Sequence, residues 1–405
     1  MRKRLIKMAY KTPPQENWNE FRNPQQRNEN YITDEHYARL VDAGFTHGMG
    51  LLEHGADVAI RALTMAEKYG LKYYVRDEIN WANILHKDFY YLNAENYKKY
   101  KKFTSFAGVY IYDEPNASKY SDLGKMVQGY YEFFNDASEP LVNLLPTYAN
   151  HIEQLGAENY EAYIRQYIQT VPTDYVMYDH YPFRANRESG GMRLHTDYLY
   201  NASVVAKLCK EYGKEMRTFV QACEVDNSDE EFTPEMLWFQ IHTNLAYGSH
   251  AIVYYYYWGN ITQQRAGVVD CEGNPTPIYE AAKKIHADLT AYEERLMECA
   301  WQKTVYLKGE KAQHNAEEFS HFEGEEQDAP FSSEYDCIVG VFDYQGKKAY
   351  YAVNYTHPSL GLNNRLNFTL SGGYEVYMNG RKTDVEGSGE IALGVGCGAF
   401  FLPKE

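Results

Sequence analysis

Short apolar runs and amphipathic helical runs alternate eight times between the start of the chain and about residue 298. The apolar runs are rich in β-branched and aromatic residues, which is typical of strands buried on both faces. Eight strand–helix units over about 300 residues fit a (β/α)8 TIM barrel in number and in length. Strands are expected at residues 5–10, 46–52, 71–75, 108–112, 141–145, 175–178, 216–222 and 251–257. Helices are expected near residues 34–44, 56–69, 94–103, 120–136, 159–171, 193–212, 233–248 and 279–297.

A doubly wound sheet also alternates strands and helices, so the turn after the first strand separates the two folds. A dinucleotide-binding sheet needs a glycine-rich turn there, because the backbone must approach a pyrophosphate closely. Here the first strand ends in Tyr10-Lys-Thr-Pro-Pro14, which contains no glycine. The barrel is therefore the expected fold, and no cofactor is predicted.

The helical pattern stops near residue 300, and short alternating runs separated by turns such as Ser371-Gly-Gly373 follow it. This pattern is typical of an antiparallel all-β module. We expect a barrel domain at residues 1–298 and a small β-sandwich domain at residues 299–405. An acidic, solvated loop is expected within residues 313–330. The strands of the module are expected at residues 303–307, 337–344, 348–355, 364–370, 374–379 and 390–393.

In a TIM barrel, the loops at the C-terminal ends of the strands build the active site, whatever the reaction. The residues that follow the expected strands are therefore the candidate site residues. They include carboxylates, an arginine, a histidine and aromatic rings, which together suit a polar polyol. They are Glu53, Arg76, Asp113, Glu114, Tyr148, Asp179, His180, Tyr181, Gln221, Glu224 and Trp258.

Glu114 is the most informative of these residues. It follows the expected strand at residues 108–112, and the alternation of side chains places Tyr110, Tyr112 and Glu114 on one face, toward the barrel mouth. A carboxyl at the end of a strand is partly desolvated and still reaches a substrate. This is the setting in which a general acid holds a raised pKa.

Glu224 follows the expected strand at residues 216–222. Alternation groups Glu224 with Val220 and Ala222, whereas an earlier strand end turns Gln221 inward and makes Glu224 a loop residue. Glycosidic cleavage needs two carboxyl groups that flank one bond. Carboxyls after the fourth and seventh strands face the mouth of a barrel from opposite sides.

Charge and composition exclude several classes of partner. The net charge of −16 argues against nucleic acid, because phosphate binding needs a basic face. No apolar run reaches the roughly 18 residues of a membrane span, and no signal-peptide run follows the basic start. The six cysteines form no CxxC pair, which indicates reduced thiols. We therefore expect a cytoplasmic protein with a carbohydrate substrate, or a secreted one if a leader has been removed, with its oligomeric state open.

These features resemble the clan A glycoside hydrolases, and within them the barrel of family 42-type β-galactosidases. The motifs that carry the resemblance are Asp113-Glu114-Pro115, Glu224, Tyr181, Trp258 and the run 245–254. The resemblance implies a retaining glycosidase acting on oligosaccharides, with Glu114 as acid/base and Glu224 as nucleophile. It further implies that Tyr181 orients the nucleophile and that Trp258 forms the floor of the sugar site.

The chain departs from that clan at Asp113, where the clan usually has asparagine. An ionised aspartate accepts a hydrogen bond from a sugar hydroxyl instead of donating one, and its charge raises the pKa of Glu114. Asp179 is a rival nucleophile or base.

Two other function classes stay open. One is a carbohydrate-binding barrel without hydrolysis. The other is a metal-dependent barrel enzyme, although no HxH follows the first strand and no HExxH occurs, so no metal is predicted. The ligands of such an enzyme would come from Glu53, His54, Asp179 and His180.

Overall fold

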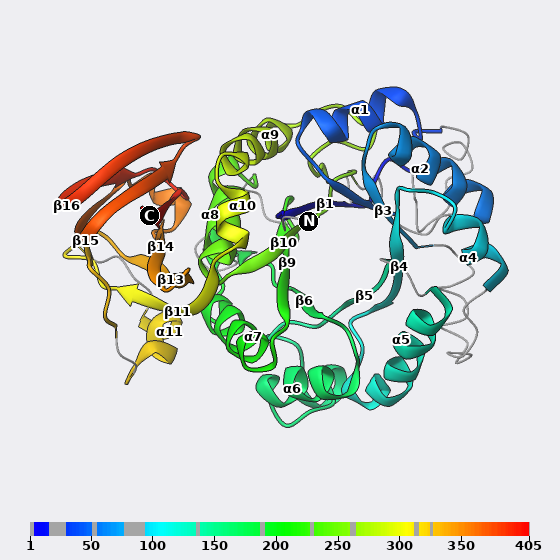
Figure 1. The fold of residues 1–405 in the computed structure, drawn as a ribbon, viewed down its shortest axis with the longest axis horizontal. Coiled ribbons are helices and arrows are strands. Elements are labelled where there is room, and N and C mark those ends of the chain that lie inside the picture. Colours follow the sequence, from blue (N-terminus) through cyan, green and yellow to red (C-terminus); the bar gives the residue numbers. More distant parts are fainter. Residues whose placement is uncertain are drawn as a thin grey trace. The chain divides into compact units, whose positions relative to one another are not determined.

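The computed structural model describes residues 4–15, 30–50, 55–76, 94–134, 138–186, 191–226, 231–259, 265–311, 316–324 and 327–404. Eight strands form one sheet in the order β5-β4-β3-β2-β1-β10-β9-β6. The pairs from β1 to β5 are parallel, and a parallel bridge between Leu144 and Tyr178 joins the segment after β5 to β6. The sheet is thus a nearly closed barrel, which confirms the predicted (β/α)8 fold (Figure 1). Its strands are β1 (Ile6–Tyr10), β2 (His47–Met49), β3 (Lys72–Val75), β4 (Phe106–Asp113), β5 (Glu139–Asn143), β6 (Tyr175–Asp179), β9 (Glu215–Gln221) and β10 (Ser249–Tyr255).

At least one helix follows each barrel strand, and the sequence signals at helix ends act as expected. The hydroxyl of Thr233 accepts a hydrogen bond from the backbone N–H of Met236, and Pro234 occupies the first helical position. Gly213 ends another helix with a φ of 65°, a left-handed conformation that glycine adopts easily. No helix in the described ranges is both long and apolar enough to cross a membrane. The barrel helices are α1 (Asp34–Asp42), α2 (Ala56–Lys68), α4 (Ala94–Tyr100), α5 (Tyr120–Phe134), α6 (Tyr160–Thr170), α7 (Tyr198–Tyr212), α8 (Pro234–Ala246), α9 (Pro277–Thr290) and α10 (Glu293–Met297).

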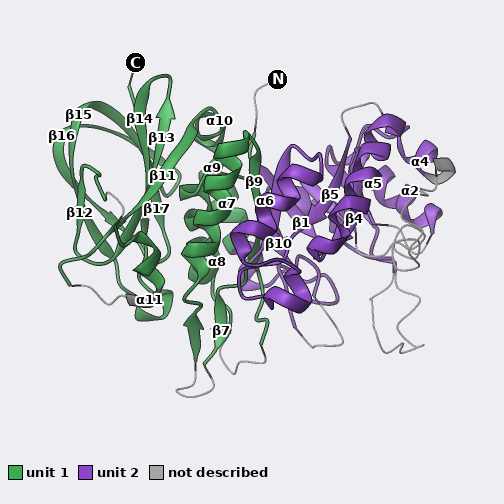
Figure 2. Ribbon diagram, turned by 90° about the horizontal axis from the view of Figure 1, so that it is seen from below, with its two compact units in different colours: residues 1–5, 180–252, 281–405 green, residues 6–179, 253–280 purple. Residues whose placement is uncertain are grey.

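Internal contacts divide the chain into two compact units, which Figure 2 colours separately. One unit comprises residues 6–179 and 253–280 and contains β1 to β6. The other comprises residues 1–5, 180–252 and 281–405 and contains β9, α7, α8 and the C-terminal sheet. The domain boundary expected at residues 298/299 falls between α10 and β11, and as a boundary it stays a prediction.

The helix expected at residues 193–212 is wrong at its start. Strand β8 (Met192–Leu194) pairs in antiparallel fashion with β7 (Phe183–Ala185), and α7 begins only at Tyr198. Pairing with a distant strand decides the conformation of this segment over its local helical preference.

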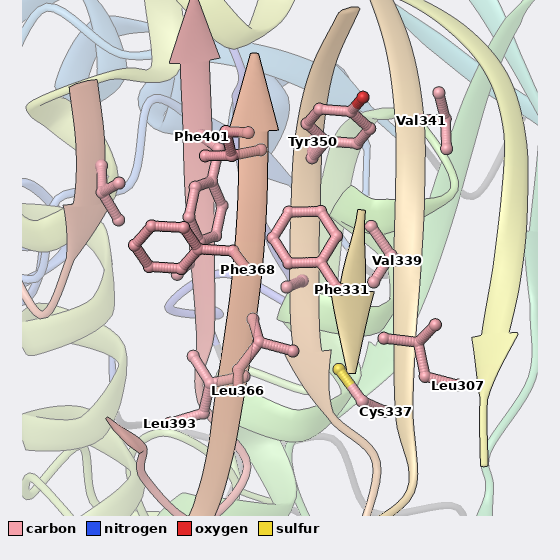
Figure 3. Packing of buried hydrophobic residues seen from close by; sticks show 14 of the residues in the cluster. Leu307, Phe331, Cys337, Val339, Val341, Tyr350, Leu366, Phe368, Leu393 and Phe401 are labelled. Carbon is pink, nitrogen blue, oxygen red and sulfur yellow. The ribbon is translucent and has the colours of Figure 1, made fainter. Parts of the chain in front are cut away.

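The C-terminal region is an antiparallel sheet with the strand order β11-β13-β14-β17-β15-β12, in which β16 also pairs with β15. Side chains from all of these strands share one hydrophobic core, shown in Figure 3. The ring of Phe331 on β12 lies 5.1 Å from Phe401 on β17 and 5.2 Å from Tyr350 on β14. In the strand order, β15 lies between β12 and β17, and both β15 and β17 lie between β12 and β14. Neighbouring strands are about 4.8 Å apart, so these rings can approach this closely only because the sheet curls around its core. The strands are β11 (Ala300–Leu307), β12 (Phe331–Ser333), β13 (Cys337–Tyr344), β14 (Lys347–Asn354), β15 (Asn364–Met378), β16 (Arg381–Leu393) and β17 (Gly398–Pro403).

Two parts of this region differ from the expectation. Strand β17 lies in the middle of the sheet and is buried throughout, so it has no alternating pattern that would reveal it. The acidic stretch expected to be a solvated loop contains the helical turn α11 (Ala316–Phe319), in which Glu318 and Phe319 are buried. The apolar residues between the acidic ones anchor this stretch to the protein.

Candidate active site

The end of β4 is shaped by a bulge. The parallel register between β4 and β5 shifts between Tyr110 and Tyr112, and such a shift interrupts the two-residue alternation of side chains. As a result the side chains of Tyr110 and Asp113 lie on the same side of β4, where both are close to the guanidinium of Arg76. The predicted shared face of Tyr110, Tyr112 and Glu114 is therefore wrong with respect to Tyr112.

Glu114 leaves the strand in a left-handed conformation, with a φ of 51° that residues other than glycine seldom adopt. Its backbone N–H donates a 2.8 Å hydrogen bond to the carbonyl of Asn143 at the end of β5. On the other side of the turn, the carbonyl of Pro115 accepts a 2.8 Å hydrogen bond from the hydroxyl of Tyr163. The turn that presents Glu114 is thus held at both ends, and strained residues of this kind cluster at functional sites.

Arg76 follows β3 and is buried, and neighbouring side chains engage its guanidinium. Its Nη1 donates to the Tyr10 hydroxyl at 2.9 Å, and its Nη2 lies 3.7 Å from Oδ2 of Asp113. The centre of its guanidinium lies 4.6 Å from the centroid of the Tyr110 ring, a cation–π contact. Arg76, predicted to bind sugar, instead holds Asp113 in place.

Asn143, the last residue of β5, bridges the carboxyl groups of two other strand ends. Its Nδ2 donates to Oδ1 of Asp179 at 2.8 Å and lies 3.4 Å from Oδ1 of Asp113. Asp179 is the last residue of β6. Carboxyl groups from β4 and β6 therefore lie on either side of one amide. Sequence reasoning missed Asn143 because the fifth strand was expected to run past it, although a lone amide in an apolar strand was a usable signal.

Asp179 is buried, with 4% of its surface exposed. Burial raises the pKa of Asp179 well above its usual range, and the neighbouring charges of Glu114 and Asp113 raise it further. The hydrogen bond from Asn143 acts in the opposite direction, because it stabilises the ionised carboxylate. These interactions bring Glu114 and Asp179 into one electrostatic group.

Glu114 is exposed to solvent, yet the protein around its carboxyl still disfavours the charged form. Partial burial, followed by the charge of Asp113, raises the pKa of Glu114 from 4.5 to about 7. As predicted, the charge of Asp113 raises the pKa of Glu114. A carboxyl that solvent reaches and that keeps its proton near neutral pH has the two properties of a general acid.

The seventh barrel strand, β9, ends at Gln221, so Glu224 lies in the loop that follows, where its carboxylate accepts a hydrogen bond from the backbone of Asp226. Gln221 is buried, and its side-chain amide accepts from the N–H of Phe183 at 3.0 Å and donates to its carbonyl at 2.9 Å. Gln221 was predicted to bind substrate, but its polar atoms instead hold the start of β7.

Trp258 was predicted to form the floor of a sugar site, and this stays a prediction that its burial does not favour. Only 1% of its surface is exposed. Its ring packs against the rings of Tyr31 and His36, at centroid distances of 4.8 and 5.0 Å. Trp258 is therefore part of the core.

The remaining predicted residues fall into three groups. Tyr148 and Tyr181 are half-buried and stay predicted sugar contacts. Glu53, together with His54, lies outside the described residues. His180 is buried, and its Nε2 lies 2.8 Å from Oδ1 of Asp197, so it is engaged inside the protein rather than open to a substrate.

Comparison with known proteins shows the fold. No family model matches the chain, and no curated protein matches it in sequence. A Bacteroides fragilis protein provisionally named an alpha-galactosidase matches with a TM-score of 0.52 and 11% identity, over 99% of this chain and 80% of that chain. A cold-adapted beta-galactosidase from Rahnella sp. R3 matches with a TM-score of 0.49 and 11% identity, over 76% of this chain and 58% of its own length.

The chain is also similar to a truncated 3-deoxy-D-arabino-heptulosonate 7-phosphate synthase from Thermotoga maritima. That protein matches with a TM-score of 0.39 and 12% identity, over 72% of this chain and 88% of that chain. At such identities the likeness defines a TIM-barrel fold of the kind that glycosidases have, and the chemistry must be argued from the site itself.

Proposed function

We propose that the protein is a glycoside hydrolase whose general acid/base is Glu114. The observation that carries the proposal is the gathering of the β4 and β6 carboxyl groups around Asn143, beside a Glu114 whose pKa is about 7. A glycosidase needs one carboxyl that holds a proton near its working pH and a second carboxyl that works ionised. A surface turn that happens to carry acidic residues requires neither a carboxyl with a raised pKa nor a second carboxyl close to it.

We infer that Asp179 is the second carboxylate. The motif resemblance favours Glu224, but the electrostatic interaction with Glu114 and the shared amide of Asn143 support Asp179. Burial and the charges of Glu114 and Asp113 favour the protonated form of Asp179, so Asp179 must release its proton to solvent before it reacts, at a cost that the hydrogen bond from Asn143 lowers. Positive charge that develops at the anomeric carbon in the transition state offsets this cost, so Asp179 stabilises the transition state more than the ground state.

The proposed reaction proceeds with retention of configuration. Glu114 donates its proton to the glycosidic oxygen while the bond to the anomeric carbon breaks, and the bonding electrons leave with that oxygen. An Oδ of Asp179 forms a bond to the anomeric carbon from the opposite face. Glu114, now ionised, removes a proton from a water molecule, whose oxygen attacks the same carbon and releases Asp179.

Asp113 is the proposed sugar contact beside the acid. Its side chain is 31% exposed, and each carboxylate oxygen has more than one lone pair, so Asp113 can accept a hydrogen bond from a sugar hydroxyl while Arg76 stays beside it. Tyr148 and Tyr181 are proposed to pack against the sugar ring. The resemblance to family 42 puts β-galactosides first among the substrates to test. α-Galactosides belong in the same panel because the Bacteroides protein carries that name.

The test is a panel of nitrophenyl glycosides with wild type, Glu114→Gln, Asp179→Asn and Glu224→Gln. Asp174→Asn is the matched control, because this exposed aspartate precedes β6 at the end opposite to Asp179. We expect Glu114→Gln and Asp179→Asn to lower kcat by at least about 10²-fold. Glu224→Gln and the control should retain activity.

Other outcomes assign the function differently. Full activity in Glu114→Gln would refute the acid assignment. An inactive Glu224→Gln beside an active Asp179→Asn would return the nucleophile to Glu224. A wild type that binds sugars and hydrolyses none of them would support the carbohydrate-binding class. The anomer of the first product, observed by NMR, tests retention.

A further inference from the structure

His180, His195 and Asp197 converge on one point. Nε2 of His180 lies 2.8 Å from Oδ1 of Asp197, and Nδ1 of His195 lies 2.6 Å from the same oxygen. The three ligand atoms all lie within 4.8 Å of one another. His180 is buried and the other two side chains are half-buried, so the group is shielded from bulk water without being sealed.

The chain builds this group with a hairpin that follows β6. Strands β7 and β8 pair in antiparallel fashion with Phe183 opposite Leu194. A 2.7 Å backbone hydrogen bond from His195 to Pro182 continues the pairing by one position beyond these strands, and a turn from His195 to Tyr198 follows it. The hairpin and this turn together bring the segments that carry His180 and Asp197 next to each other.

Asp197 gives up its usual local role. It occupies the N-cap position of α7, where an aspartate ordinarily accepts a hydrogen bond from a backbone N–H of the first turn. Here its side chain makes no such bond. Its carboxylate instead lies beside the imidazoles of His180 and His195, which indicates that Asp197 has a role other than capping the helix.

We propose that His180, His195 and Asp197 bind a divalent transition-metal ion of the zinc class. Two imidazole nitrogens and one carboxylate oxygen are a ligand set that zinc accepts, with a fourth position left for water or a bound molecule. Metal–ligand bonds of about 2.0–2.2 Å in a tetrahedron hold the ligand atoms about 3.3–3.5 Å apart. The present separations of 2.8 and 2.6 Å need to open by less than about 1 Å to admit the ion.

The site goes beyond the proposed glycosidase and does not rest on it. It also differs from the ligand sets considered from the sequence, since His195 and Asp197 were not among those residues. The competing arrangement is a metal-free triad in which Asp197 accepts an N–H from each imidazole. A chelator distinguishes the two arrangements. It removes a bound metal and so lowers the stability of a metal-bound site, but it leaves the stability of a metal-free triad unchanged.

The experiment uses the full chain, treated with a chelator and then titrated with Zn²⁺ by calorimetry, with bound zinc measured by elemental analysis. We expect one equivalent of zinc per chain and a rise in Tm on zinc addition, reversed by the chelator. His195→Ala and Asp197→Asn should lose the bound zinc, while His151→Ala, which removes an exposed histidine outside the group, should keep it.

A wild type that binds no more zinc than Asp197→Asn would overturn the proposal and leave the hydrogen-bonded triad. Zinc bound equally by all variants would do the same, because it would lie elsewhere. If a variant fails to fold, as judged by circular dichroism, the wild type alone still decides. A Tm that neither zinc nor the chelator moves contradicts the site.

Discussion

Replacing Asp113 with asparagine should move the alkaline limb of the pH–rate profile to lower pH. In the proposed mechanism Glu114 must be protonated to act, so kcat/KM falls as the pH rises through its pKa of about 7. The charge of Asp113 disfavours ionisation of Glu114, and asparagine removes that charge while keeping the size of the side chain. The pKa of Glu114 should therefore fall, and activity above neutral pH should fall with it.

The structure bounds the size of this effect. The pKa of Glu114 rises from 4.5 to about 7, and burial is the larger cause, so Asp113 accounts for less than half of the rise. For scale, two unit charges about 4 Å apart interact by about 1 kcal/mol in water and about 4 kcal/mol at an effective dielectric constant near 20. Because Glu114 is exposed to solvent, the lower part of this range applies. We expect a pKa of about 6–6.5 in Asp113→Asn, which lowers kcat/KM at pH 8 to about one third to one tenth of the wild-type value at the same pH, once each profile is normalised to its maximum.

The assay is kcat/KM from pH 4 to pH 9 on the best nitrophenyl glycoside, for wild type, Asp113→Asn and Asp174→Asn. The control removes an equal charge at the far end of β6, about 16 Å from Asp179 along the strand, and should leave the limb in place. The Tm of each variant is also measured, because Asp113→Asn removes the carboxylate beside Arg76 and the loss of that partner could destabilise the protein. An alkaline limb that stays fixed or moves upward in Asp113→Asn would refute Glu114 as the titrating acid.

Three further predictions concern the same fold. Asn143→Leu removes the hydrogen bond from Asn143 to Asp179, so kcat should fall about 10- to 150-fold, the equivalent of about 1.5–3 kcal/mol. An unchanged kcat would show that this hydrogen bond plays no part in the reaction. Gly108→Ala should lower the free energy of unfolding by about 2–5 kcal/mol in denaturant titrations, because its Cβ would lie 1.7 Å from the carbonyl oxygen of Glu139 at a φ of +153°. Wild-type stability would contradict this close approach of β4 to β5. Burial raises the pKa of Glu318 to about 8, so the unfolded chain ionises first and stability is lost as the pH rises from about 4.5 to 8. Glu318→Gln should reduce that loss in Tm, and an identical pH dependence in both proteins would show that Glu318 is not buried.

The barrel follows from local pattern and length. Strands buried on both faces and helices with one apolar face differ in periodicity, so eight repeats were visible without any knowledge of contacts. Helix signals such as Thr233-Pro234 also act locally. Strand β17 escaped because a strand buried throughout has no alternation, and the start of α7 was misplaced because β8 forms only by pairing with β7.

The site was predictable as a set of strand ends but not as a geometry. Glu114, Asp113 and Asp179 were identified because the C-terminal ends of barrel strands must meet. The bulge in β4 depends on its register with β5, which no single strand reveals. Whether Trp258 is covered by other rings or open to a ligand likewise depends on residues distant in the sequence.

The most direct test of the central claim compares two leaving groups on one sugar, with wild type and Glu114→Gln. A dinitrophenolate leaves without a proton, whereas an alkoxide needs one, so only the alkyl glycoside depends on a general acid. We predict this outcome for kcat/KM, which reports the bond-breaking step and not the later attack of water that Glu114 assists as a base. In Glu114→Gln, kcat/KM should stay within about 10-fold of wild type for the dinitrophenyl glycoside and fall by at least about 10²-fold for the alkyl glycoside. Equal losses on both substrates, or no loss on either, would contradict the role of Glu114 as the proton donor.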